Sequence, residues 1–170
     1  FPSKTLCAHV TTWNKDASIK FRTDVAMMCK LGFDIKMSDL NPNEQVYCRQ
    51  AVTEYNRLKP VILEGDLYRL VSPYGSNHTS SMYVNKDKNQ AIVFAFDVYP
   101  RYGEHILPVR LQGLEANKMY QVKEINLMPG ASSSVNGNGQ TFSGEYLMNV
   151  GLDLFTGYKL NSRIIEIIAQ

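Results

Sequence analysis

Residues 41–73, NPNEQVYCRQAVTEYNRLKPVILEGDLYRLVSP, decide the fold, because the chain changes character within them. Asn41 is suited to cap a helix, Pro42 to the first helical position, and Glu44 to bond back to the cap. Apolar side chains then recur every three or four residues, at Val46, Val52, Tyr55 and Leu58. This pattern predicts an amphipathic helix over residues 41–59.

The second half of that stretch predicts where the helix gives way to a sheet. Pro60 lacks an amide donor, so the helix should end or kink near Lys59. One more turn should follow and stop at Gly65, which can adopt a left-handed cap. From Leu67 the apolar residues alternate with a period of two, which indicates strands.

Upstream of residue 41, short strands and helices alternate. TLCAHV at residues 5–10 predicts a buried strand, residues 21–31 predict a helix that stops at Gly32, and FDIKM at residues 33–37 predicts a second strand. Two successive β-α units are typical of a parallel sheet or barrel.

Downstream of Gly65 the pattern predicts an antiparallel β-sandwich, because short strands follow one another at regular spacing. In residues 91–98 the bulky Ile92, Phe94, Phe96 and Val98 share one face, and smaller side chains share the other. The isoleucines near the C-terminus would make the last strand apolar on both faces, so it should be central or covered. The predicted strands are Leu67–Ser72, Ser81–Asn85, Ala91–Val98, Leu107–Gln112, Met119–Leu127, Gly144–Val150, Leu152–Phe155 and Ser162–Ala169.

The composition excludes several classes of protein. A net charge of +2 without a Lys/Arg stripe gives no case for nucleic acid, and no apolar run approaches the roughly 20 residues of a membrane helix. Cys7, Cys29 and Cys48 are odd in number and lack CxxC spacing, so we expect buried thiols, with neither a disulfide framework nor a zinc site. The first residue is not Met, so we expect a piece of a longer chain, and no compartment is indicated.

Three residues of the β-α part are candidates for a site. His9 falls late in its predicted strand, and Trp13 falls in the loop that follows. In (β/α) barrels the active site lies at the carboxyl ends of the strands and in these loops. An exposed indole offers a flat apolar face for a sugar, so His9 and Trp13 are candidate substrate-binding residues. The alternative is that both are packing residues. For Asp34 we expect a structural salt link with Arg22, Lys30 or Lys36 rather than catalysis.

The sandwich part shows no catalytic pattern. Its acidic residues are scattered, and glycoside hydrolysis needs two carboxylates roughly 5 to 9 Å apart. Residues 129–139, PGASSSVNGNG, predict a mobile loop, because Gly, Ser and Asn bury little apolar area. The scattered acids are Asp66, Asp97, Glu104, Glu145 and Asp153.

Several segments resemble the C-terminal part of glycoside hydrolase family 36, the α-galactosidases of the melibiase type. They are CAHV, FRTDVAMM followed by KLGFDI, EYNRLKPVILEGDLYRL and MYVNKDKNQAIVFAF, all in the first 96 residues. LPVRLQGLEANKMYQV and SGEYLMNVGLDL resemble the family's later strands, so the resemblance covers nearly the whole chain.

The resemblance implies a mostly β chain, an antiparallel β-sandwich preceded by the last two β-α units of a (β/α)8 barrel. Residues 1–64 would end the barrel and residues 65–170 would form the sandwich. His9 would lie on the seventh barrel strand, Phe33–Met37 would be the eighth, and Asn41–Lys59 the last barrel helix.

The resemblance also implies retaining hydrolysis of terminal α-galactosides, without a metal or organic cofactor. The family's nucleophile and acid/base lie in Lys-Trp-Asp and Ser-Asp-x-x-Asp motifs, and neither motif occurs in these residues. No catalytic residue is therefore assigned, and we expect the chain alone to be inactive. Its sugar partners would be reached through the intact enzyme.

Two other functions stay open. One is a non-catalytic carbohydrate-binding or structural sandwich module, for which Tyr99, Tyr102 and Tyr158 are candidate exposed aromatics. The other is a different barrel glycosidase with a similar tail, such as an α-glucosidase or α-N-acetylgalactosaminidase. For the chain alone we expect self-association through the open barrel edge.

Overall fold

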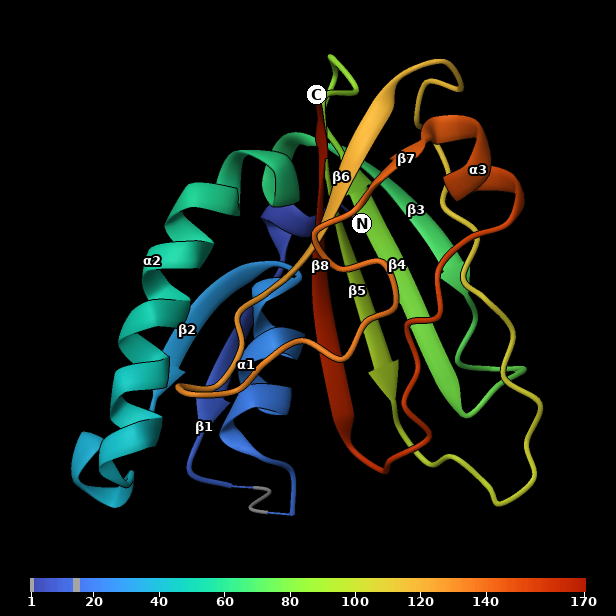
Figure 1. Cartoon of the computed structure of the whole chain (residues 1–170). Coiled ribbons are helices and arrows are strands. Elements are labelled where there is room, and N and C mark those ends of the chain that lie inside the picture. The colour runs from blue at the N-terminus through green and yellow to red at the C-terminus, as the bar shows by residue number, and fades with distance from the viewer. Residues whose placement is uncertain (1, 14–15) are drawn as a thin grey trace.

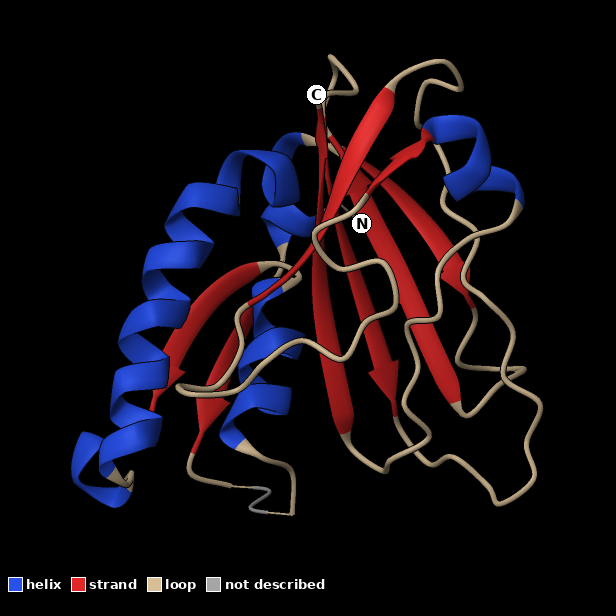
Figure 2. Ribbon diagram, viewed as in Figure 1, coloured by secondary structure: helices blue, strands red, loops and turns tan. Residues whose placement is uncertain are grey.

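The computed structural model describes residues 2–13 and 16–170, and its elements form two adjoining parts (Figure 1). Two helices and a two-stranded parallel sheet form the first part, and a six-stranded antiparallel sheet forms the second. In the ribbon coloured by element type the two helices of the first part lie on the left and the large sheet on the right (Figure 2). The mostly β, antiparallel fold class is thus confirmed.

The first part consists of β1 (Cys7–Thr11), α1 (Ile19–Met27), β2 (Lys30–Asp34) and α2 (Pro42–Glu64). β1 and β2 run parallel, with Val10 opposite Phe33 and Thr11 opposite Asp34. Two β-α units are therefore present.

The prediction of β2 at residues 33–37 was three residues too late, and Gly32 lies inside the strand instead of ending a helix. The reason is tertiary. The Tyr55 hydroxyl donates to the Cys29 carbonyl at 2.8 Å, and the Tyr83 hydroxyl donates to that of Met28 at 2.7 Å. These distant tyrosines bind the carbonyls of the two residues that follow α1, so the chain turns into β2 early.

Helix α2 begins as predicted. The Glu44 amide donates to Asn41 Oδ1 and the Asn41 amide donates to Glu44 Oε2, both at 3.0 Å, so the capping box is complete.

Helix α2 ends next to Gly65 as predicted, but it is not interrupted at Pro60. The helix continues through Pro60 to Glu64, because Val61 and Ile62 are buried against the large sheet. Gly65 is not left-handed either, with a φ of −76°. A Cβ there would lie 2.4 Å from the Val61 carbonyl oxygen and 2.7 Å from that of Val84, so this glycine allows close backbone approach.

The large sheet has the strand order β3-β4-β5-β8-β6-β7. The last strand in the chain, β8, pairs with both β5 and β6, which confirms that it is central. The strands are β3 (Asp66–Val71), β4 (His78–Val84), β5 (Gln90–Asp97), β6 (Met119–Ile125), β7 (Thr141–Ser143) and β8 (Asn161–Ala169).

Both faces of this sheet are buried. Ile92, Phe94 and Phe96 of β5 face α2, where Leu58 and Ile62 are fully buried. The small-residue face of β5 packs against long segments that form the second layer of the sandwich, and these contribute Val109, Leu111, Leu114, Val135, Leu147, Leu152 and Leu154. The predicted alternation within residues 91–98 therefore holds, with each face covered by a different layer.

The second layer contains less regular strand than predicted. The expected strands at Leu107–Gln112 and Leu152–Phe155 are extended segments joined by an antiparallel bridge between Val109 and Leu152. The expected strand at Gly144–Val150 is helix α3 (Gly144–Asn149). The Ser143 hydroxyl accepts from the Tyr146 amide at 3.1 Å, so a serine cap starts this helix.

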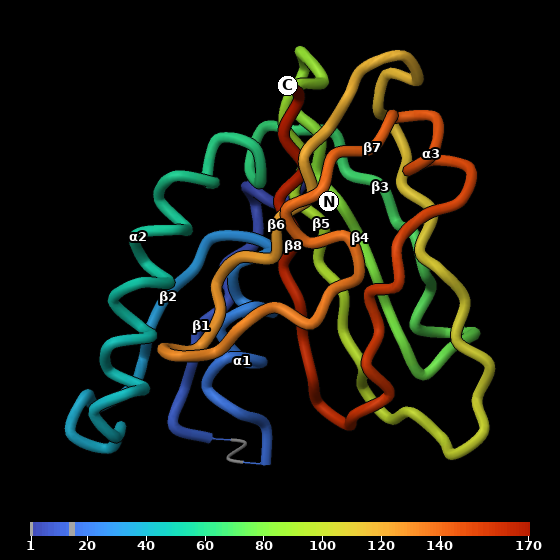
Figure 3. The backbone as a smooth tube through the Cα atoms, in the orientation of Figure 1, coloured from blue at the N-terminus to red at the C-terminus, as the bar shows by residue number. Residues whose placement is uncertain are grey.

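The segment after β6 connects the two parts. Residues 126–140 extend from β6 toward α2 before returning to β7 (Figure 3). The loop at residues 129–139, predicted to be mobile, is held by side chains. Arg163 donates to Ser134 Oγ, and the Glu124 amide donates to Asn138 Oδ1 at 2.8 Å.

Two expectations from composition are addressed by the structure. All three thiols are free, and Cys29 and Cys48 are buried as predicted. Cys7 is exposed, contrary to prediction, because it lies on the face of β1 that points away from the helices. Burial raises the pKa of the Cys29 and Cys48 thiols. Among the described residues, no helix has the length and apolar character to cross a bilayer.

Candidate functional site

One face of the small parallel sheet carries polar side chains that are open to solvent. Side chains alternate along a strand, so Ala8 and Val10 pack toward the helices while Cys7, His9 and Thr11 share the other face. His9 lies opposite Gly32 of β2, and its ring lies directly over that glycine. A Cβ at residue 32 would be 2.5 Å from His9 Cδ2, so the imidazole position requires glycine there.

A pocket of about 410 Å³ lies at the carboxyl ends of β1 and β2. Trp13, 78% exposed, lines it together with Asp34 and Lys36. Its remaining lining comes from Thr11, Thr12, Phe33 and Ile35. The structure therefore brings Trp13 and Asp34 together, whereas His9 lies two residues back along β1 and outside the pocket lining.

Asp34 does not make the predicted salt link. Within residues 2–13 and 16–170, no Lys or Arg nitrogen forms an ion pair with its carboxylate. Arg22, one of the expected partners, instead donates to the Thr11 carbonyl at 2.6 Å and holds the end of β1. The pocket thus presents an indole face, hydroxyls, one carboxylate and one ammonium group, which suits binding of a polyhydroxylated ligand.

A buried polar cluster connects the small sheet's helices with the large sheet. Asp24 of α1 is 0% exposed, and its carboxylate accepts hydrogen bonds from four side chains. Asn126 Nδ2 donates at 2.6 Å, the Ser162 hydroxyl at 2.7 Å, and the Tyr47 hydroxyl at 3.3 Å. Lys20 Nζ forms the ion pair. Burial, followed by the Asp24 charge, raises the pKa of Tyr47, so its hydroxyl remains a donor.

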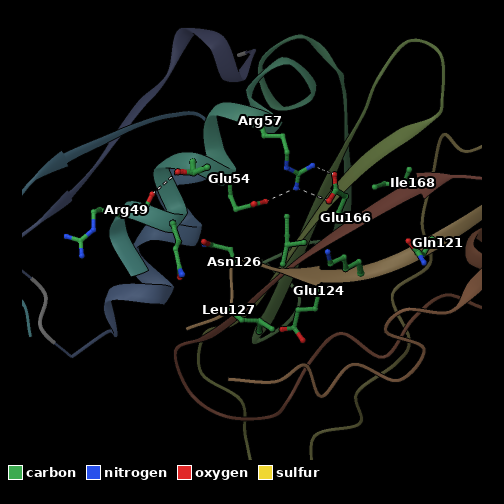
Figure 4. A pocket seen from close by; sticks show the side chains of 13 residues that line it. Arg49, Glu54, Arg57, Gln121, Glu124, Asn126, Leu127, Glu166 and Ile168 are labelled. Carbon is green, nitrogen blue, oxygen red and sulfur yellow. Dashed lines mark hydrogen bonds and ion pairs between the residues drawn. The ribbon is translucent and has the colours of Figure 1, made fainter. Parts of the chain in front are cut away.

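A pocket of about 760 Å³ lies between α2 and strands β6 and β8 (Figure 4). Arg57 of α2 points to Glu166 of β8 and binds it through two nitrogens, at 2.5 and 2.9 Å. The second of these nitrogens also donates to Glu54 at 2.7 Å, and Gln90 Nε2 donates to Glu166 at 2.7 Å.

The carboxylates of that pocket are committed to structural pairs. Burial alone would raise the pKa of Glu166, but the hydrogen bonds from Arg57 and Gln90 outweigh it, so the pKa is below its usual value. Glu124 accepts from Ser133 and lies 3.7 Å from Arg163 Nε. Because each carboxylate is paired with an arginine side chain, we interpret this pocket as a structural junction.

A third polar cluster lies where β4 and β5 meet the loops. His78 Nδ1 is 2.7 Å from Asp97 Oδ1, and Nε2 is 3.6 Å from Glu104 Oε2. Asp97 also accepts from the Thr156 amide at 2.9 Å. His78 and Asp97 are buried, so they anchor the loop before β8. The described residues contain no group of three His, Cys, Asp or Glu side chains suited to a metal.

Comparison with known families identifies the chain. The model of the glycosyl hydrolase family 36 C-terminal domain matches residues 78–167, more than half of the chain. The chain belongs to glycosyl hydrolase family 36. Its match to the C-terminal domain agrees with the antiparallel sheet described above.

The chain is similar to several α-galactosidases. Alpha-galactosidase 2 of Hypocrea jecorina is 28% identical over all of this chain, and probable alpha-galactosidase C of Aspergillus oryzae is 31% identical. The crystal structure of the family 36 α-galactosidase AgaB from Geobacillus stearothermophilus superposes on 99% of the chain with a TM-score of 0.83 and 26% identity. The chain spans only 22% of the length of each of these proteins.

The sequence predicted Trp13 as a site residue, and its contact with a sugar stays a prediction, but the clusters around Asp24, Glu166 and His78 were missed. Their partners lie far apart in the chain; Asp24 and Ser162, for example, are 138 residues apart. One sequence signal could have indicated these clusters, namely a charged residue within an apolar pattern, such as Glu166 among the isoleucines of β8. A charge buried in this way requires a partner.

Proposed function

We propose that this chain is the C-terminal part of an α-galactosidase that hydrolyses terminal α-galactosides with retention. Residues 1–64 complete the end of its (β/α)8 barrel, and residues 65–170 form the sandwich that supports that end. His9 and Trp13 contact the bound sugar. The two catalytic aspartates lie upstream, so the 170 residues alone do not hydrolyse the substrate.

One observation carries this proposal: parallel strands β1 and β2 end together at a pocket with an exposed indole. In (β/α)8 barrels the substrate binds at the carboxyl ends of the strands. Trp13 and Asp34 lie at those ends, and His9 lies on the polar face, where a barrel interior would be. Among the described residues lining the pocket, Asp34 is the only carboxylate, so this part supplies sugar binding rather than the two-carboxylate chemistry of hydrolysis.

The decisive test is the coding sequence upstream of residue 1. We expect one open frame that contains the Lys-Trp-Asp and Ser-Asp-x-x-Asp motifs. A start codon close to residue 1, with neither motif before it, would overturn the proposal and leave a non-catalytic carbohydrate-binding or structural module.

In the longer enzyme, Trp13→Ala should raise the KM for raffinose about tenfold with little change in kcat, because a stacking surface is lost. His9→Ala should lower kcat/KM by about the same factor. Tyr146→Ala is the matched control, since Tyr146 is a half-exposed aromatic residue on α3 outside the pocket. Unchanged kinetics in both site variants would contradict the assigned sugar contacts.

The isolated chain should self-associate through the edges of the small sheet. β1 and β2 each pair with one strand only, and Leu6 and Met37 nearby are 49% and 43% exposed. Unpaired strand edges and apolar surface favour association. Light scattering should give a mass above 19.3 kDa that rises with concentration. A monomer at every concentration would show that these edges remain solvated.

A further inference from the structure

Two loops of the sandwich form a pocket that the proposed hydrolysis does not use. Residues 73–77 and 101–104 enclose about 600 Å³. The loops follow β3 and β5, and Figure 1 shows them at the same lower end of the molecule as the carboxyl ends of β1 and β2. The pocket is separate from the one that contains Trp13, because the two have no lining residue in common.

Two tyrosines in this pocket are fully exposed. Tyr74 comes from the first loop and is 99% exposed, and Tyr102 comes from the second and is 109% exposed. Exposed aromatic side chains that border a polar pocket are typical of binding surfaces, because a rigid ring supplies contact area at little conformational cost.

The polar groups between the tyrosines are preorganised. Asn77 Nδ2 donates to both oxygens of Glu104 at 3.2 Å, and the Arg101 amide donates to Oε2 at 3.0 Å. The Arg101 hydrogen bond, with help from Asn77, lowers the pKa of Glu104, so the carboxylate is an acceptor at neutral pH.

The floor of the pocket is rigidly supported. The Asn77 carbonyl accepts from the Val98 amide at 3.0 Å, which joins the two loops at the ends of β4 and β5. Beneath them, buried His78 is fixed by Asp97 at 2.7 Å, and its Nε2 lies 3.6 Å from Glu104 Oε2 without forming a hydrogen bond. The loops therefore hold Glu104 in place before any ligand arrives.

We propose that this pocket is a non-catalytic binding site for a neutral oligosaccharide. The rings of Tyr74 and Tyr102 stack on sugar faces, and Glu104 accepts hydrogen bonds from sugar hydroxyls. The Glu104 carboxylate is held by uncharged donors, the Asn77 side chain and the Arg101 backbone amide, which suits hydrogen bonding to a neutral polyol. Among the described lining residues Glu104 is the only carboxylate, so the site lacks the second carboxylate that hydrolysis requires.

Binding of stachyose to the 170-residue chain, followed by calorimetry, tests the site. Tyr74→Ala and Tyr102→Ala should each weaken binding about tenfold, which is the loss expected for one stacking ring. Tyr158→Ala is the matched control, because Tyr158 is 74% exposed yet does not line the pocket. Galactose should bind more weakly than stachyose, because a single sugar ring can stack on only one of the two tyrosines.

Trp13→Ala separates this site from the proposed catalytic pocket. Stachyose binding that survives Trp13→Ala but is weakened by both tyrosine variants supports the sandwich site. Binding abolished by Trp13→Ala alone, or no binding at millimolar stachyose, overturns it. Hydroxyl-radical footprinting of the longer enzyme gives a further check. Protection of Tyr74 and Tyr102 without sugar would mean that another part of the polypeptide covers the pocket, which also overturns the proposal.

Discussion

Replacement of Asp24 by alanine is expected to lower the free energy of unfolding by about 3 to 5 kcal/mol. The carboxylate is completely buried and accepts from Lys20, Tyr47, Asn126 and Ser162. Without it, the Lys20 ammonium loses its ion-pair partner, and buried donors on both parts of the molecule lose their acceptor. Urea unfolding at pH 7 measures the loss.

Two further variants give this expectation its controls. Asp24→Asn keeps the shape and removes the charge, so it should cost less than alanine but still destabilise. Asp87→Ala removes an exposed acid from the loop between β4 and β5 and should change stability by less than about 0.5 kcal/mol. Equal stabilities for Asp24→Ala and Asp87→Ala would show that the cluster contributes nothing.

Replacement of Gly151 by alanine should cost about 3 kcal/mol of unfolding free energy. Gly151 has a φ of +90°, which strains any side chain, and an added Cβ would lie 2.4 Å from the Val109 carbonyl oxygen. That oxygen accepts from the Leu152 amide at 3.0 Å in the bridge of the second layer. Because the atoms that the added Cβ would meet all belong to the backbone of Val109 and Arg110, the bridge has to move. Calorimetry should show a drop in Tm of about 6 to 12 °C.

A substitution at Gly130 measures the cost of the left-handed backbone conformation without a steric clash. Its φ is +80°, but a Cβ there would meet no heavy atom within 4 Å. Gly130→Ala should therefore cost only about 1 to 2 kcal/mol, the price of the left-handed conformation alone. If Gly151→Ala costs no more than this control, the second layer tolerates displacement at the Val109–Leu152 bridge.

Local patterns predicted the elements whose stability is local. The capping box at Asn41 needs only residues within one turn, and the alternation from Ile92 to Val98 needs only a sheet with two unlike faces. Both features appear in the structure. The central position of β8 was also predicted from its own residues. A strand with isoleucine on both faces needs other parts of the protein packed against both of those faces.

The errors occur where distant residues decide the outcome. Pro60 should disrupt a helix on its own, but burial of Val61 and Ile62 on the sheet extends α2 past it. α1 ends where tyrosine hydroxyls from α2 and β4 donate to the carbonyls of Met28 and Cys29, just after the helix. The same limit applies to the sites. The exposure of Trp13 follows from its place in a loop after a strand, so it could be predicted locally. Tyr74 and Tyr102 line one pocket only because two distant loops meet in the folded chain.

The central position of β8 has a consequence during synthesis. β5 and β6 are both made before it, and each pairs with β8 along the edge that faces it. Until residues 161–169 leave the ribosome, these two apolar strands present unsatisfied backbone groups and the sheet is split in two. Long-range pairing of this kind is slow and prone to aggregation. Chains cut short before residue 161 would therefore be expected to aggregate, so correct assembly of this sheet depends on β8.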